Sequence, residues 1–248
     1  MKPKFSIISL TSCSGCISAL ISLDIFEDFL EKVDLLYFPF IMDEKRIEEC
    51  DIFLIEGCVI DDEQIKLLKQ IRRKARKVVA FGTCAAFGGI LNLSEDINGE
   101  PISNYIEIDG IIPGCPPPLK ILGNSLINLL ENKKIVLPEK NLCYDCPLKE
   151  NIQKNFEISI DELMDEGYKT EKVIPKCFLE KNILCLGPIT RAGCDCSCIK
   201  LGIPCEGCMG PLKQDYTSII INFLSLLNLS DDLRKYKSIF FRFSKPNL

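Results

Sequence analysis

The sequence predicts an α/β fold class, with a doubly wound parallel sheet followed by an irregular cysteine-rich region and C-terminal helices. Two observations carry this prediction. Strand-like and helix-like apolar patterns alternate over the first 138 residues, which is typical of a parallel sheet covered by helices. The 15 cysteines are unevenly spread, because six lie before residue 140, nine lie between residues 143 and 208, and none follows.

The first part of the chain has the pattern of five strands and three helices. Short apolar runs predict strands at residues 5–10, 33–38, 51–55, 77–81 and 106–112. Apolar residues at helical spacing predict helices at residues 17–31, 62–76 and 119–131. In the second of these helices Ile65, Leu68 and Ile71 fall on one face, opposite basic residues. This order of elements favours a flavodoxin-like sheet with strand order 2-1-3-4-5.

A second domain is expected over residues 139–248, after a first domain at residues 1–138. Its cysteine-rich segment contains many Gly and Pro residues and shows little periodicity. Such a segment lacks the apolar content for a core of its own and would need inorganic staples. A short helix is expected at residues 160–166. The tail beyond residue 215 holds two helical stretches, and Ser230 is the expected N-cap of the second.

Composition excludes several classes of function. The chain has no histidine, so it cannot form a Ser-His-Asp triad, a Cys-His pair or a His-ligated zinc site. A net charge of −5 is unfavourable for binding nucleic acid, and no stretch reaches the roughly 18 apolar residues of a membrane span. The apolar run near the N-terminus is too short for an export signal. We therefore expect a cytoplasmic protein without membrane insertion, whose cysteines bind metal rather than form disulfides.

Four cysteines of the first part follow predicted strands. Cys13 and Cys16 come after the first strand. Cys84 and Cys115 come after the fourth and the fifth. All lie past the carboxyl ends of the strands, where doubly wound sheets build their sites. A Cys-x-x-Cys pair and two distant thiolates can hold a [4Fe–4S] cluster, and the alternative is a set of ordinary buried cysteines.

Two further cysteines of the first part are expected to be spectators. Cys50 stands in an acidic stretch before the third strand, which favours a core position. Cys58 follows the third strand and could approach the cluster, but four ligands are already available.

The second part has enough thiols for two four-cysteine sites, with one left over. These are Cys143, Cys146, Cys177, Cys185, Cys194, Cys196, Cys198, Cys205 and Cys208. Zinc held by two Cys-x-x-Cys pairs is the serious alternative to iron–sulfur clusters. The long irregular spacings fit zinc knuckles poorly, although the run typical of bacterial ferredoxins is absent too.

Motifs from both parts occur together in one known family. They are Thr11-Ser12-Cys13-Ser14-Gly15-Cys16, Ile55-Glu56-Gly57, Gly82-Thr83-Cys84-Ala85, Pro113-Gly114-Cys115-Pro116, the run from Cys185 to Cys194, and Pro204-Cys205-Glu206-Gly207-Cys208. Over roughly residues 4–212 the chain resembles the small subunit of [NiFe] hydrogenases. Within that family it resembles the small subunits of cytoplasmic multi-subunit enzymes. The two candidates are the delta subunit of archaeal sulfhydrogenases and the gamma subunit of the methyl-viologen-reducing, heterodisulfide-reductase-linked hydrogenase.

The resemblance implies three [4Fe–4S] clusters. The proximal cluster would be bound by Cys13, Cys16, Cys84 and Cys115. The distal cluster would be bound by Cys143, Cys146, Cys177 and Cys185, and the medial cluster by Cys194, Cys198, Cys205 and Cys208. Many relatives use a histidine where this chain has Cys143, and many have a proline and a three-iron cluster where it has Cys198. Cys196 could substitute for Cys198.

The resemblance also implies the role of the chain within an enzyme complex. A separate large subunit would split hydrogen at a nickel–iron site, and this chain would transfer the electrons. The acceptor would be a flavin- and NAD(P)-linked subunit, or heterodisulfide reductase or ferredoxin. Glu56 could position the cluster loop or carry protons, unless it is a solvated or N-cap carboxylate. Arg191 could donate to a cluster sulfur, unless it pairs at the surface.

Two other functions are kept open. The first is the small iron–sulfur subunit of a complex I-like oxidoreductase, whose first motif has adjacent cysteines rather than the separated Cys13 and Cys16. The second is a zinc-stapled scaffold without redox function.

Overall fold

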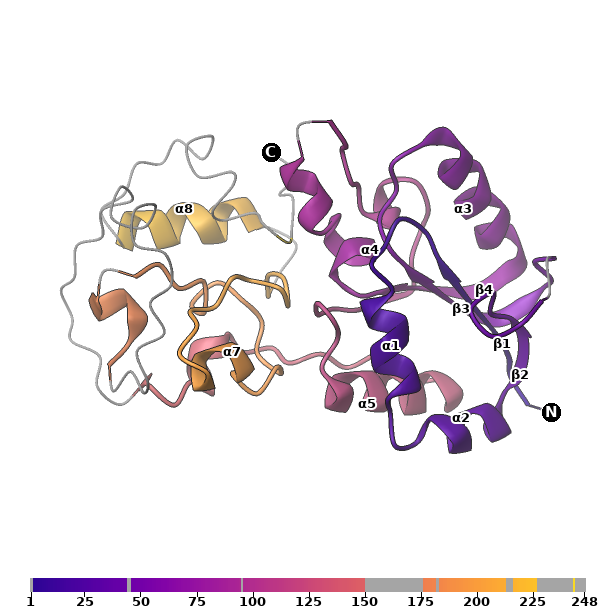
Figure 1. The fold of residues 1–248 in the computed structure, drawn as a ribbon, viewed down its shortest axis with the longest axis horizontal. Coiled ribbons are helices and arrows are strands. Elements are labelled where there is room, and N and C mark those ends of the chain that lie inside the picture. Colours follow the sequence, from indigo (N-terminus) through magenta and orange to yellow (C-terminus); the bar gives the residue numbers. More distant parts are fainter. Residues whose placement is uncertain are drawn as a thin grey trace. The chain divides into compact units, whose positions relative to one another are not determined.

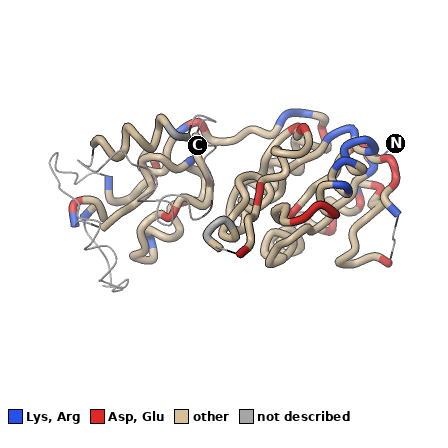
Figure 2. Tube along the Cα trace, turned by 90° about the horizontal axis from the view of Figure 1, so that it is seen from above, with Lys and Arg blue, Asp and Glu red and all other residues tan. Residues whose placement is uncertain are grey.

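The computed structural model describes residues 2–43, 46–94, 96–149, 176–181, 183–212, 216–226 and 243. The chain divides into two compact units, the first ending at Leu137 and the second beginning at Pro138. Figure 2 shows both acidic and basic residues along the first unit.

The first unit is built on a five-stranded parallel sheet (Figure 1). Its strands are β1 (Lys4–Ser9), β2 (Asp34–Tyr37), β3 (Cys50–Glu56), β4 (Ala75–Phe81) and β5 (Gly110–Ile112). They lie in the order β2-β1-β3-β4-β5, which confirms the predicted flavodoxin-like sheet. The central strands β3 and β4 are almost wholly buried, as expected of a parallel sheet covered on both faces.

Helices cover both faces of this sheet (Figure 1). They are α1 (Gly15–Ile21), α2 (Phe26–Lys32), α3 (Asp62–Lys74), α4 (Thr83–Phe87) and α5 (Leu119–Leu130). Leu68 and Ile71 of α3 are fully buried against the sheet, as the apolar spacing predicts. The Asp61 carboxylate begins α3 by accepting a hydrogen bond from the Gln64 N–H at 2.8 Å.

The structure corrects two predicted elements of this unit. The single helix expected at residues 17–31 is split into α1 and α2. The Ser22 hydroxyl bonds back to the Ser18 carbonyl, and the next N–H, that of Leu23, bonds to the Leu20 carbonyl three residues back instead of continuing the helical pattern. The last strand begins at Gly110 rather than at residue 106, because Ile106 closes a local turn onto the Ile102 carbonyl. The short helix α4 was not expected from the sequence.

The second unit contains short helices joined by irregular segments. They are η3 (Leu142–Tyr144), η5 (Phe178–Lys181), α7 (Ser197–Lys200) and α8 (Tyr216–Leu226). The sequence predicts no apolar core for the cysteine-rich segment, but the structure shows one that this segment shares with α8. Ile220, Phe223 and Leu224 of α8 pack with apolar loop residues such as Phe178 and Leu186. Helix α8 is the first of the two tail helices expected; the helix at residues 160–166 and the one after Ser230 lie outside the described residues.

Within the part of the chain that the structure describes, no helix has both the length and the apolar character needed to cross a bilayer.

Candidate functional site

The carboxyl edge of the sheet gathers the four thiols of the predicted proximal site. Cys13 and Cys16 lie between β1 and the first turn of α1. Cys84 lies in α4 after β4, and Cys115 follows β5. Burial chiefly raises the pKa of Cys84 to about 12, and neighbouring thiols that include Cys115 and Cys13 add to the effect. The pKa of Cys16 is raised by burial and then by Glu56, Cys84 and Cys115, so the four thiols lie within electrostatic reach of one another.

Two glycines leave space around these sulfurs. A Cβ atom added at Gly82 would lie 2.2 Å from the Cys16 Sγ atom, and one added at Gly89 would lie 2.4 Å from the Cys84 Sγ atom. Both glycines have positive φ angles, +86° and +68°, which side-chain-bearing residues rarely adopt. The sulfurs therefore occupy space that any other residue at these positions would fill.

Glu56 holds the loop that carries Cys13 and Cys16. The carboxylate is 1% exposed at the end of β3. Its Oε2 atom accepts hydrogen bonds from the hydroxyls of Ser9 at 2.6 Å and Ser12 at 3.3 Å, and Oε1 accepts one from the Cys16 N–H at 2.9 Å. Glu56 is therefore not a solvated carboxylate. Its hydrogen bonds are those expected of a residue that positions the loop. The two serine partners lie at the end of β1 and in the loop that follows it, a position at which sheet edges build sites.

Two hydrogen bonds between Thr83 and Gly114 join the loops that carry the other two thiols. The Thr83 N–H donates to the Gly114 carbonyl at 3.0 Å. The Gly114 N–H donates in return to the Thr83 hydroxyl at 3.0 Å. Cys84 and Cys115 each follow one member of this pair, so their separation is fixed locally. The motif around Thr83 carries no local signal of this role, because the partner lies 31 residues away in the chain.

The two expected spectators are both buried. Cys50 is 6% exposed and belongs to the apolar core around β3. Cys58 is fully buried, and its Sγ atom donates to the Thr11 carbonyl at 3.7 Å. Cys58 also contributes to the raised pKa of Cys84, so it lies beside the four-thiol group while its proton is directed to the backbone.

In the second unit the structure brings the four predicted distal thiols together. Burial first, and then the thiols of Cys185, Cys146 and Cys177, raise the pKa of Cys143 to about 12. A Cβ atom added at Gly187 would lie 3.2 Å from the Cys143 Sγ atom and 3.6 Å from that of Cys185. This space between two sulfurs repeats the arrangement seen in the first unit.

The predicted medial thiols lie in two pairs. Burial and then the neighbouring Cys194 raise the pKa of Cys198. Burial raises the pKa of Cys205, with smaller contributions from Cys185 and Cys208. The Cys205 N–H also donates to the Cys185 Sγ atom at 3.3 Å, which joins one medial position to one distal position.

Cys196 is placed differently from its neighbours. Its side chain is 1% exposed in the apolar core of the second unit, and its Sγ atom donates to the Leu142 carbonyl at 3.8 Å. Burial first, and then Cys146 and Cys194, raise its pKa to about 12. Cys198 is exposed, by contrast. The thiol of Cys196 is thus directed to the backbone at Leu142, on the side of the distal group.

The Arg191 guanidinium bonds to the backbone, and its expected donation to a cluster sulfur stays a prediction. It donates to three backbone carbonyls, at 2.7 Å to Pro138 and at 2.9 Å to both Pro211 and Leu212. Among the residues that the structure describes, it contacts neither a surface carboxylate nor a sulfur. Its contacts instead tie the first residues of the second unit to the segment after Cys208.

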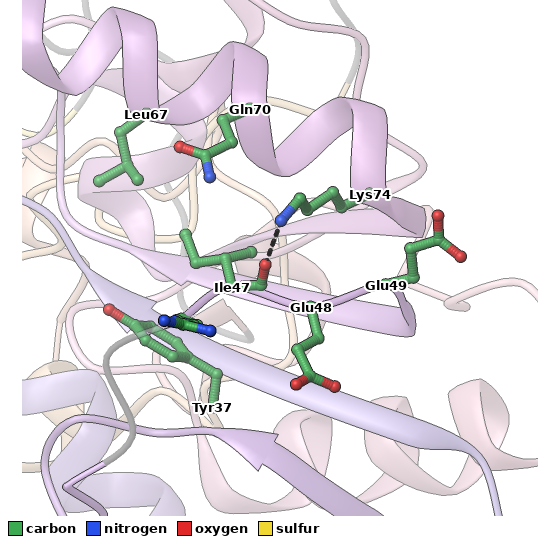
Figure 3. A pocket seen from close by; sticks show the side chains of 8 residues that line it. Tyr37, Ile47, Glu48, Glu49, Leu67, Gln70 and Lys74 are labelled. Atoms are coloured by element: carbon green, nitrogen blue, oxygen red, sulfur yellow. Dashed lines mark hydrogen bonds between the residues drawn. The ribbon is translucent and has the colours of Figure 1, made fainter.

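A separate hollow of about 550 Å³ lies near the amino ends of β3 and β4, at the edge of the sheet opposite the thiol group (Figure 3). Its lining includes Ile47, which precedes β3, and Lys74, which ends α3 before β4 and donates to the Ile47 carbonyl. Because these residues lie at the amino ends of the strands, the hollow is not part of the thiol group at the carboxyl edge.

Comparison with known proteins gives matches over both units. Residues 13–129 match the family of the NADH ubiquinone oxidoreductase 20 kDa subunit. A subunit of the F420-non-reducing hydrogenase vhu of Methanococcus voltae is 32% identical, covering 99% of this chain and 96% of the relative. The delta subunit of sulfhydrogenase 2 of Pyrococcus furiosus is 27% identical, covering 84% and 86%. The [NiFeSe] hydrogenase structure from Desulfovibrio vulgaris Hildenborough shares the fold, with 21% identity, a TM-score of 0.59 and coverage of 85% and 94%.

Proposed function

Because the chain belongs to the family of F420-non-reducing hydrogenase small subunits, which are small subunits of [NiFe]-type hydrogenases, we propose that it conducts electrons through three [4Fe–4S] clusters. The proximal cluster is held by Cys13, Cys16, Cys84 and Cys115. The distal cluster is held by Cys143, Cys146, Cys177 and Cys185, and the medial cluster by Cys194, Cys198, Cys205 and Cys208. Each cluster supplies one-electron transfer when bound.

The observation that carries this proposal is the thiol group at the carboxyl edge of the sheet. Its donors come from three separate loops, and Gly82 and Gly89 keep the space beside two of the sulfurs free of side chains. Buried neutral thiols with raised pKa values exchange their protons for iron when a cluster binds. Glu56 fixes the loop of Cys16 through a backbone hydrogen bond, so that sulfur is positioned before any iron arrives.

A hydrogen bond supports the continuity of the pathway in the second unit. The Cys205 N–H and the Cys185 Sγ atom lie 3.3 Å apart, and the Leu186 N–H donates back to the Cys205 carbonyl at 2.8 Å. One proposed medial ligand is therefore in direct contact with one proposed distal ligand. Such contacts between ligands keep two clusters close and raise electronic coupling.

Iron–sulfur clusters are proposed in preference to zinc because the long, irregular spacings of the second-unit cysteines along the chain fit zinc knuckles poorly.

The surface beside the proximal group suits a protein partner, which we propose is the hydrogenase large subunit. Cys13 and Cys115 are exposed there. Ile60, Ile90 and Leu119, which follow the same strand ends, are 40%, 52% and 50% exposed. Apolar side chains around exposed ligands are typical of a surface that another chain covers.

The acceptor is proposed to be a further subunit of flavin- and NAD(P)-linked or heterodisulfide reductase type, in a cytoplasmic complex. The NAD-linked type is supported by the name of one relative, an NAD-reducing hydrogenase, and the heterodisulfide reductase type follows from the resemblance stated above. A complex I-like role is supported by the match of residues 13–129, but that match ends before all nine cysteines of the second unit.

The test is the metal content of the complex purified without oxygen. Three cubes require about twelve irons per chain, no stoichiometric zinc, and an absorption band near 400 nm that bleaches on reduction. Cys16→Ser should remove about four irons, and Cys50→Ser, the matched change at a buried thiol outside the groups, should remove none. A content of four irons and two zincs per chain would show a one-cluster protein and refute the proposed electron pathway.

A further inference from the structure

A fifth thiol lies beside the turn that carries Cys143 and Cys146. It belongs to Cys196, whose Sγ atom donates to the Leu142 carbonyl at 3.8 Å, 54 residues away in the chain. The same carbonyl accepts the Asp145 N–H at 3.1 Å and so closes the turn between the two proposed distal ligands. The Cys196 thiol therefore lies against the backbone of the loop that would hold one side of the distal cluster.

The backbone directs the Cys196 side chain inward. Asp195 and Cys196 both have positive φ angles, +57° and +53°, which residues other than glycine rarely adopt. They form a turn before α7 that leaves Cys196 1% exposed, whereas Cys198 is exposed. Cys196 thus lies in the apolar core of the second unit, against which Cys146 and Cys194 also pack.

The electrostatic neighbours of Cys196 include two proposed distal ligands. After burial, the thiol of Cys146 contributes most to the raised pKa of Cys196, ahead of Cys194. Cys196 in turn contributes to the raised pKa of Cys143, after burial and the other distal thiols. The pKa of Cys198 is raised by burial and then by Cys194. Cys196 is therefore placed with the distal thiols rather than as a second Cys198.

We propose that Cys196 is a reserve ligand of the distal cluster, able to bind the iron that Cys146 would otherwise bind. A cube needs one thiolate for each of its four irons. When Cys146 is lost, the Cys196 thiol releases its proton to solvent and its sulfur forms the iron–sulfur bond, so no electron is exchanged. This inference rests on the proposed function, because it requires a distal cluster on Cys143, Cys146, Cys177 and Cys185.

The test compares alanine variants of the intact hydrogenase complex, purified without oxygen, by iron content and by the EPR signal of the reduced distal cluster. Alanine is used because a serine oxygen can itself bind iron. Cys177→Ala is the reference for a distal ligand without a reserve, and it should lose the distal signal and up to about four irons. Cys146→Ala should keep the signal and about twelve irons, and Cys146→Ala with Cys196→Ala should match Cys177→Ala.

Two further variants control for the second change. Cys196→Ala alone should keep the distal signal, which also shows that the second unit folds without this thiol. Cys50→Ala removes a buried thiol outside the groups, and its addition to Cys146→Ala should change neither the signal nor the iron content.

The outcomes separate this inference from the proposed function. A wild-type complex without the distal signal would overturn the proposed function. A wild-type complex with all of its iron, in which Cys146→Ala loses the signal as Cys177→Ala does, would overturn the reserve role alone. The reserve role is also overturned if the double variant keeps the signal, because Cys196 is then not needed. Loss of the signal in Cys196→Ala alone would make Cys196 a resident ligand and would overturn it too.

Discussion

Replacing Gly82 by alanine should remove the proximal cluster and leave the other two. The added Cβ atom would lie 2.2 Å from the Cys16 Sγ atom, where ordinary contacts begin at 3.4 Å. The sulfur must therefore move by about 1 Å, which is large against the tolerance of a metal ligand. The positive φ angle of +86° adds about 1–2 kcal/mol of backbone strain for a residue with a Cβ atom.

The assay is iron per chain in the complex purified without oxygen. Wild type should hold about twelve irons and Gly82→Ala about eight. Gly123→Ala is the matched control, because its added Cβ atom meets only the Ile25 Cδ1 atom, at an ordinary 3.6 Å, in the interior of α5. This control should keep twelve irons and gain about 0.5–1 kcal/mol of stability. Twelve irons in Gly82→Ala would show that the space beside Cys16 is not needed for a cluster.

Three further predictions concern the same unit. Glu56→Ala should lower the free energy of unfolding, measured in urea, by about 3 kcal/mol, and Glu56→Gln should lower it by about 1 kcal/mol, because the buried carboxylate accepts three hydrogen bonds. Equal effects of the two variants would contradict this account. Cys58→Ser and Cys50→Ser should keep all of the iron by elemental analysis, and a loss of four irons in Cys58→Ser would make that residue a ligand. Ile90→Asp should weaken binding of the large subunit by about tenfold in a pull-down titration. Val136→Asp, at a position that is 75% exposed, should not weaken it. Equal effects of the two variants would place the partner elsewhere.

The placement of the cysteines along the chain was enough to predict the sheet edge on which four of them meet. Strands follow from local apolar patterns, and parallel strands direct their carboxyl ends to one edge, so residues after β1, β4 and β5 converge whatever the details of packing. The break between α1 and α2 could not be read in this way. It involves the Ser22 hydroxyl on the Ser18 carbonyl and the Leu23 N–H on the Leu20 carbonyl, local contacts that apolar spacing does not record.

The roles of single polar residues also needed the tertiary structure. Glu56 and Arg191 were each consistent with two or more positions, because a charged side chain in a motif can be solvated, paired or buried. Only the fold brings the Glu56 carboxylate to the Cys16 N–H, 40 residues away in the chain, and the Arg191 guanidinium to carbonyls at both ends of the cysteine-rich loops. Long-range contacts of this kind have no local signature in the sequence.

The sequence by itself determined which metal ligands are available, because 15 cysteines without a histidine leave thiolates first and carboxylates second, and its motifs identify a hydrogenase small subunit. The tertiary structure decided which polar groups hold the cysteine loops in place. It also decided that Cys58 and Cys196 direct their protons to backbone carbonyls, because these contacts arise only when segments distant in the chain pack together.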